Sequence, residues 1–266
     1  NYHELFLGGG SVLFALLSLQ KQNKITIHNK IYAYDLNFDL INAYKHIQQN
    51  KDELYQHIKF YLDTYVDING TEVNRKPENI EDALTSKESY YYWLRQKYNN
   101  IEKGTVECSA LFIFINKTCF RGMYREGPNG FNVPYGHYKT ITNIINEEEL
   151  DTISDLIQDV EFIHSNFCDS IKNINEGDFV YMDPPYAPEN ETSFVGYNLD
   201  GFDLETHELL FNEIKNLENI KFIMSNSNVP LVIEHFENYE KEEIIARRAI
   251  NAKNPAATTK EVIIYN

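Results

Sequence analysis

Four consecutive residues, Asp183, Pro184, Pro185 and Tyr186, have the chemistry to hold a planar group that carries an amine. They directly follow the apolar run 179–182, an expected strand, and α/β sheets bind ligands at the carboxyl ends of their strands. The prolines restrict the backbone and remove two N–H donors, so carbonyl oxygens and the Asp183 carboxylate remain as acceptors beside the Tyr186 ring. This set suits an exocyclic amine on a planar base; the alternative is a proline turn that only ends a strand.

A second feature is the run Gly8, Gly9 and Gly10, between a strand expected over 2–6 and a helix expected from Ser11. Such a turn lets the backbone approach a ligand, and the helix start offers unpaired N–H groups. A buried strand expected over 25–35 ends at Asp35, whose carboxylate can accept from both hydroxyls of a ribose. The turn lacks GxGxxG and GK[ST], so a nucleoside cofactor without a pyrophosphate fits better than NAD or ATP. A purely structural turn is the alternative.

Basic residues gather in two stretches of a chain whose net charge is −16. The first stretch, 117–139, contains Lys117, Arg121, Arg125 and Lys139, and the second, 246–260, contains Arg247 and Arg248. The acidic balance argues against nonspecific nucleic-acid binding through the whole surface. Because salt screens charges beyond about 8–10 Å, a local basic cleft can still bind DNA, and ordinary solvated surface is the alternative.

The elements that must position these residues alternate between strands and helices at both ends of the chain. Further strands are expected over 221–224 and 262–265, and a helix over 39–50. Residues 47–104 are polar, aromatic and helical in pattern, 108–116 are apolar and of undetermined type, and 121–138 indicate an ordered loop or hairpin. The pattern predicts an α/β fold with a mainly parallel sheet, interrupted by an inserted region near 47–144.

Several classes of protein are excluded by composition. Apolar residues make up 42% of the chain, which excludes a disordered protein. Cys108, Cys119 and Cys168 are too far apart for a CxxC site, and the histidines lack HxxxH spacing, so we expect no metal. The apolar stretch 5–19 is too short for a membrane span, and residues 1–20 lack the basic start of a signal peptide. We therefore expect a cytoplasmic protein that is neither secreted nor bound to a membrane.

Taken in order, Phe6-x-Gly8-x-Gly10, Asp35-Leu36-Asn37 and Asp183-Pro184-Pro185-Tyr186 resemble the motifs of the D12 class of DNA adenine-N6 methyltransferases, the group of the bacterial GATC-methylating enzyme. Three more segments are similar to the family. They are the hairpin-like stretch 111–136, the run Ser165-Asn166-Phe167-Cys168-Asp169, and Arg247-Arg248 followed by Glu261. The resemblance covers nearly the whole chain.

The resemblance implies a Rossmann-like fold for S-adenosylmethionine-dependent methyltransferases, with an inserted, mainly helical target-recognition domain that carries a β-hairpin loop. The catalytic domain would comprise 1–46 and 145–266, and the DNA-binding insert 47–144. Asp183, Pro184, Pro185 and Tyr186 would be catalytic. The cofactor S-adenosylmethionine would be bound by Phe6, Gly8, Gly9, Gly10, Asp35, Leu36, Asn166, Phe167 and Asp183. Double-stranded DNA would be bound by Lys117, Phe120, Arg121, Arg125, Asn132, Pro134, Lys139, Arg247 and Arg248.

The implied reaction methylates N6 of an adenine that has left the duplex, because a stacked base cannot reach such a pocket. Hydrogen bonds from N6 to Asp183 and the Pro184 carbonyl would direct the nitrogen lone pair toward the methyl group. A methyltransferase for another amine (cytosine N4, RNA adenine or a protein glutamine amide) and a degenerate, DNA-binding protein are the alternatives. The family's PGGK-like segment has no counterpart in the printed sequence, and Arg121 replaces the family's usual Asn. Neither the recognition motif nor a partner restriction nuclease can be read from the sequence.

Overall fold

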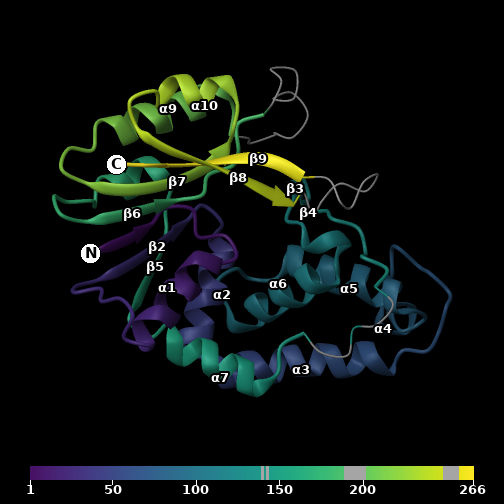
Figure 1. Cartoon of the computed structure of the whole chain (residues 1–266). Helices are drawn as coiled ribbons and strands as arrows, with labels where there is room; N and C mark the ends of the chain where they lie inside the picture. The colour runs from purple at the N-terminus through teal and green to yellow at the C-terminus, as the bar shows by residue number, and fades with distance from the viewer. Residues whose placement is uncertain (139–140, 142–143, 189–201, 248–257) are drawn as a thin grey trace. The chain divides into compact units, whose positions relative to one another are not determined.

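The structure is a computed structural model that describes residues 1–138, 141, 144–188, 202–247 and 258–266. Its contacts divide the chain into two compact units (Figure 1). The first unit comprises Asn1–Leu36 and Asp159–Asn266, and the second comprises Asn37–Gln158. The second unit extends beyond the predicted insert 47–144 at both ends, because α2 (Phe38–Gln49) and α7 (Glu147–Leu156) pack on other helices of that unit.

The first unit is built on a seven-stranded sheet in the order β5-β2-β1-β6-β7-β9-β8. Five strands run parallel: β1 (Tyr2–Glu4), β2 (Ile31–Asp35), β5 (Val160–His164), β6 (Phe179–Met182) and β7 (Lys221–Ser227). β9 (Thr258–Tyr265) pairs antiparallel with both β7 and β8 (Glu240–Arg247). The mixed α/β architecture with a mostly parallel sheet is confirmed, although the sequence patterns missed β5 and β8 and placed the start of β2 six residues too early.

The core of this unit lies between the sheet and its short helices. α9 (Leu204–Lys215) and α10 (Pro230–His235) lie over the part of the sheet formed by β6, β7 and β9 (Figure 1). Val180, Met182 and Met224 are fully buried in this cluster. Strands covered in this way read as continuous apolar runs, which is why β6 was recognisable from the sequence. The remaining helices of the unit are α1 (Ser11–Lys21) and α8 (Phe167–Ile171).

The second unit is mainly helical, with α3 (Lys51–Asp67), α4 (Ile80–Ala83), α5 (Lys87–Asn100), α6 (Val106–Thr118), a 3-10 turn η1 (Phe120–Gly122) and a two-stranded hairpin of β3 (Glu126–Gly127) and β4 (Gly130–Phe131). The apolar run 108–116, whose type the sequence left open, lies in α6. This helix begins after its cap, Thr105, and is buried on almost every side. A helix that is apolar all round is a core helix. Tyr90, Tyr91 and Tyr98 of α5 are buried beside it, whereas Trp93 is only partly buried.

Candidate active site

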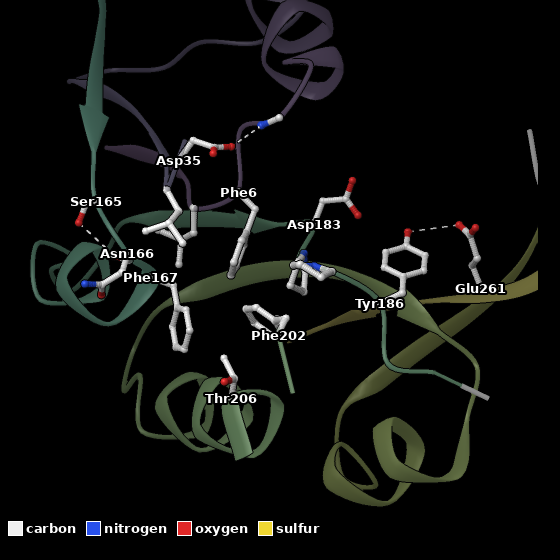
Figure 2. A pocket seen from close by; sticks show the side chains of 15 residues that line it. Phe6, Asp35, Ser165, Asn166, Phe167, Asp183, Tyr186, Phe202, Thr206 and Glu261 are labelled. Carbon is white, nitrogen blue, oxygen red and sulfur yellow. Dashed lines mark hydrogen bonds between the residues drawn. The ribbon is translucent and has the colours of Figure 1, made fainter. Parts of the chain in front are cut away.

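A cavity of about 710 Å³ opens in the first unit at the carboxyl ends of the parallel strands (Figure 2). β2, β1 and β6 are neighbours in the sheet and run in the same direction, so the segments that follow them reach one edge together. That edge is where open α/β sheets bind ligands. The lining residues are Leu5, Phe6, Gly8, Asp35, Leu36, Ser165, Asn166, Phe167, Asp183, Pro184, Pro185, Tyr186, Phe202, Thr206 and Glu261.

The glycine turn and Asp35 form one side of the cavity. The Gly8 N–H donates to Asp35 Oδ2 over 2.9 Å, which ties the end of β1 to the end of β2. Gly8 has a φ of +49°, and a Cβ built there meets nothing within 4 Å, so the turn faces open space where a ligand can approach. Gly9 and Gly10, predicted as cofactor residues, are not part of the cavity lining; Gly10 instead begins α1 in a left-handed conformation.

An aromatic cluster forms the opposite side (Figure 2). The rings of Phe6, Phe167 and Phe202 lie 5.8–6.0 Å apart, centroid to centroid. Asn166 directly precedes Phe167 and is the N-terminal cap of α8, where its Oδ1 accepts from the Asp169 N–H over 2.9 Å. Leu36 is 70% exposed at the rim, unusual for a large apolar residue that directly follows a buried strand. Such a slot suits one flat ring of a ligand.

The turn after β6 is held by groups from β7 and α9. The Ser225 hydroxyl donates to Asp183 Oδ1 over 2.9 Å, and His207 Nε2 lies 3.0 Å from the Pro185 carbonyl oxygen. Asp183 is nevertheless exposed to the cavity. Within the described part of the chain, no donor is bonded to the Pro184 carbonyl. The turn therefore places the Asp183 carboxylate at the cavity, next to Pro184.

Tyr186 belongs to the same turn after β6 as Asp183, and it is 37% exposed. Its hydroxyl donates to Glu261 Oε2 over 3.3 Å (Figure 2). Burial, with the charge of Asp183, raises the pKa of Tyr186 well above its ordinary value, so the side chain is a neutral phenol at physiological pH. Glu261 reaches this edge because it pairs with Ser227 in the antiparallel ladder of β7 and β9.

Glu4 is a carboxyl group near the site that sequence reasoning did not single out. It is 2% exposed at the end of β1 and accepts from the Tyr2 hydroxyl over 2.7 Å. Burial raises the pKa of Glu4 to about 7, and the nearby charge of Asp183 acts in the same direction. Phe202 and Ser225 were missed as well. The available signal was an acid at the end of the expected strand, four residues before Gly8.

The predicted DNA-contacting residues of the hairpin stretch lie in the second unit. Lys117, Phe120, Arg121, Arg125, Asn132 and Pro134 are all exposed. From 131 to 135 buried and exposed residues alternate, so Asn132 and Pro134 face outward while the intervening side chains anchor the segment. Arg125 Nε donates to Asn132 Oδ1 over 2.6 Å, which brings two of the predicted residues together. Arg121 has a φ of +58°, and its guanidinium lies over the Phe120 ring.

Side chains of two helices hold the hairpin segment. Asn99 of α5 pairs with both backbone groups of Phe131: its Oδ1 accepts over 2.9 Å and its Nδ2 donates over 3.0 Å. The Tyr91 hydroxyl and Arg95 both donate to the Val133 carbonyl. The hydroxyls of Tyr65 and Tyr135 are bonded over 2.6 Å. The exposed face of the hairpin is therefore presented on a fixed backbone.

Three other predicted DNA-binding residues cannot be placed with the rest. Lys139 and Arg248 lie outside the described residues, and Arg247 ends β8 with a side chain that is not described.

Across the described residues, no group of three His, Cys, Asp or Glu side chains has the arrangement of metal ligands. No helix in those same ranges has both the length and the apolar character needed to cross a bilayer.

Comparison with known proteins identifies the family. The profile of the D12 class N6 adenine-specific DNA methyltransferases matches residues 1–250. The chain is 33% identical over 259 residues to the type II methyltransferase M.MjaIII of Methanocaldococcus jannaschii, which covers 95% of this chain and 82% of that protein. It is 31% identical over 276 residues to M1.LlaDCHI of Lactococcus lactis subsp. cremoris, covering 100% of this chain and 86% of that protein.

A further relative is the DNA adenine methylase of Escherichia coli K12, with 27% identity over 263 residues, 97% of this chain and 82% of that enzyme. These alignments extend over both units, so they include the cavity and the hairpin stretch alike. The chain therefore belongs to the D12 class of N6 adenine-specific DNA methyltransferases.

Proposed function

We propose that this protein transfers a methyl group from S-adenosylmethionine to N6 of an adenine extruded from duplex DNA at a short motif. One observation carries the proposal: Asp183, Pro184 and Tyr186 line the same cavity as Asp35 and Gly8. A base and a nucleoside cofactor can therefore meet in one place, and holding reactants in contact is a large part of catalysis.

The residues on the β1 and β2 side fit the cofactor. Asp35 offers a carboxylate at a strand end for the ribose hydroxyls, and the open side of Gly8 leaves room for a ligand against the backbone. Phe167 and Leu36 form apolar walls for the adenine ring, with Asn166 beside them. S-adenosylmethionine supplies a methyl group activated by its sulfonium.

Asp183 and Pro184 act on the target amine. The adenine N6 lone pair is delocalised into the ring and is a weak nucleophile. When the two N–H groups of this amine donate hydrogen bonds to the Asp183 carboxylate and the Pro184 carbonyl, the nitrogen moves toward tetrahedral geometry. Its lone pair then becomes available for attack on the methyl group. Tyr186 stacks on the extruded base, which offsets part of the few kcal/mol that unstacking costs.

The second unit, Asn37–Gln158, would recognise the DNA. Its hairpin exposes Arg125, whose guanidinium can bond a guanine in the major groove and discriminate by about 1–3 kcal/mol. Lys117 and Arg121 would bind phosphates and set the register. GATC is the first motif to test, because the chain resembles bacterial DNA adenine methylases.

The test is transfer of labelled methyl groups from S-adenosylmethionine to unmethylated genomic DNA, with modified bases mapped by single-molecule sequencing. We expect N6-methyladenine confined to one short motif. Asp183→Ala should lower the rate at least about a hundredfold while circular dichroism and the melting temperature stay unchanged. Asp159→Ala, which removes an exposed acid of the same unit outside the cavity, is the matched control and should keep normal turnover.

Three outcomes would contradict the proposal. Near-normal turnover of Asp183→Ala would remove the assigned role of the carboxylate. Label found on cytosine, RNA or protein, with none on DNA adenine, would support a methyltransferase for another amine. A protein that binds DNA yet shows no heat of binding with S-adenosylmethionine would support the DNA-binding alternative.

A further inference from the structure

One strand of the sheet extends beyond its neighbour and lies alongside the turn that carries Asp183. β6 ends at Met182, which pairs with Met224, whereas β7 continues to Ser227. Residues 225–227 therefore run past the end of β6. From this arrangement we propose that Ser225 is a positioning residue that holds the Asp183 carboxylate in the orientation that accepts the target amine. The inference rests on the proposed function.

The direction of the hydrogen bond follows from the groups involved. Ser225 is 7% exposed, and its Oγ lies 2.9 Å from Asp183 Oδ1. A carboxylate accepts and cannot donate, so the only hydroxyl proton of Ser225 points at Asp183. A hydrogen bond to a charged acceptor is stronger than one between neutral groups, so it selects a single orientation of the side chain.

A second hydroxyl supports the first. Tyr181 Oη lies 3.2 Å from Ser225 Oγ, and the geometry allows either hydroxyl to donate; when Ser225 donates its proton to Asp183, Tyr181 is the donor in this pair. Burial raises the pKa of Tyr181, so its phenol keeps the proton that it donates. The three residues form a one-way chain from Tyr181 through Ser225 to Asp183.

This chain explains how an exposed carboxylate can be held ready. Asp183 is exposed to the cavity, and the hydrogen bond from Ser225 restricts rotation about its side-chain bonds. With Oδ1 bonded to Ser225, Oδ2 is left to accept from the amine. A misplacement of about 1 Å in such a group can lower the rate about a hundredfold.

The backbone of the turn is fixed by other residues. The Ala187 N–H donates to Asn226 Oδ1 over 3.0 Å, and Ser227 Oγ donates to the Ala187 carbonyl. His207 Nε2 lies 3.0 Å from the Pro185 carbonyl oxygen. Removing the Ser225 hydroxyl therefore frees the Asp183 side chain without releasing the turn.

The test compares Ser225→Ala, Ser225→Thr and Tyr181→Phe in single-turnover methyl transfer, with the dissociation constant of S-adenosylmethionine measured by calorimetry. We expect Ser225→Ala to transfer about 10–100-fold more slowly with cofactor affinity unchanged within about twofold. Ser225→Thr keeps the hydroxyl and should restore most of the rate, and Tyr181→Phe should fall in between. Ser18→Ala is the matched control, because that hydroxyl bonds only the Phe14 carbonyl of its own helix, and it should match the unmodified protein.

Crystal structures of the unmodified protein and of Ser225→Ala provide a readout that does not depend on activity. One Asp183 orientation in the first and several in the second would support the inference. The same single orientation in both, or equal transfer rates, would overturn it. Loss of cofactor binding together with the rate in Ser225→Ala would indicate a structural role and also overturn it. If the unmodified protein methylates no DNA, the proposed function fails, and the orientation of Asp183 still decides the role of Ser225.

Discussion

Replacing Glu4 by glutamine should make the stability of this protein less dependent on pH. Glu4 is 2% exposed, and burial raises its pKa from 4.5 to about 7. The folded protein therefore keeps the Glu4 proton up to about pH 7, whereas the unfolded chain releases it above pH 4.5. Because the folded state binds the extra proton in this window, the stability that Glu4 contributes is complete below pH 4.5 and is lost as the pH rises through 7.

The size of the loss follows from the same values. The two pKa values differ by about 2.5, and each pKa unit corresponds to about 1.36 kcal/mol, so the free energy of unfolding should fall by about 3 kcal/mol on this account. Glutamine resembles the protonated acid in shape and cannot ionise. The free energy of unfolding of Glu4→Gln should therefore rise relative to that of the unmodified protein as the pH rises.

Urea denaturation at pH 5, 6, 7 and 8 measures this difference, since contributions of other titrating groups cancel between the two proteins. The difference in unfolding free energy should grow by about 2.5 kcal/mol from pH 5 to pH 8, because the first part of the loss already occurs between pH 4.5 and pH 5. Glu161→Gln on β5 replaces an exposed acid, where the burial that causes the Glu4 effect is absent, and it is the control for the substitution itself. A Glu4→Gln difference that is constant with pH, or that grows toward acid, would refute the reasoning.

Three further predictions concern other contacts. Asp35→Ala removes the acceptor at the end of β2 and should weaken S-adenosylmethionine binding about tenfold to a hundredfold in calorimetry; unchanged affinity would place the ribose elsewhere. Asn99→Ala removes both hydrogen bonds to the Phe131 backbone and should lower the preference for the recognised motif over single-base variants about tenfold, measured by competition between oligonucleotides. Equal preference would show that the hairpin is held by other contacts. Asp39→Ala leaves the buried Tyr98 hydroxyl without its acceptor and the partly exposed Lys103 without its partner, so urea denaturation should show a loss of about 1–3 kcal/mol, and an unchanged stability would contradict the buried pairing.

The fold was predictable where local pattern and burial agree. The run 179–182 was recognisable because it is apolar and its Val180 and Met182 are fully buried, and the glycine turn is visible because left-handed backbone favours glycine. β5 and β8 were missed, since polar residues interrupt β5 and β8 is rich in glutamate and lies at the edge of the sheet. The compact second unit begins at Asn37, before the predicted insert 47–144, and the sequence of α2 alone does not show which helices it packs on.

The amino-acid sequence by itself determined the family and the groups available for chemistry, because the motifs at 6–10, 35–37 and 183–186 are short segments whose order along the chain can be read directly. The tertiary structure alone decided which distant groups act on them. Ser225 meets Asp183 across 42 residues because the register of β6 and β7 sets that contact. Glu4 has its raised pKa because packing removes water from it, and neither the strand register nor the burial of this one acid can be read from the residues around it.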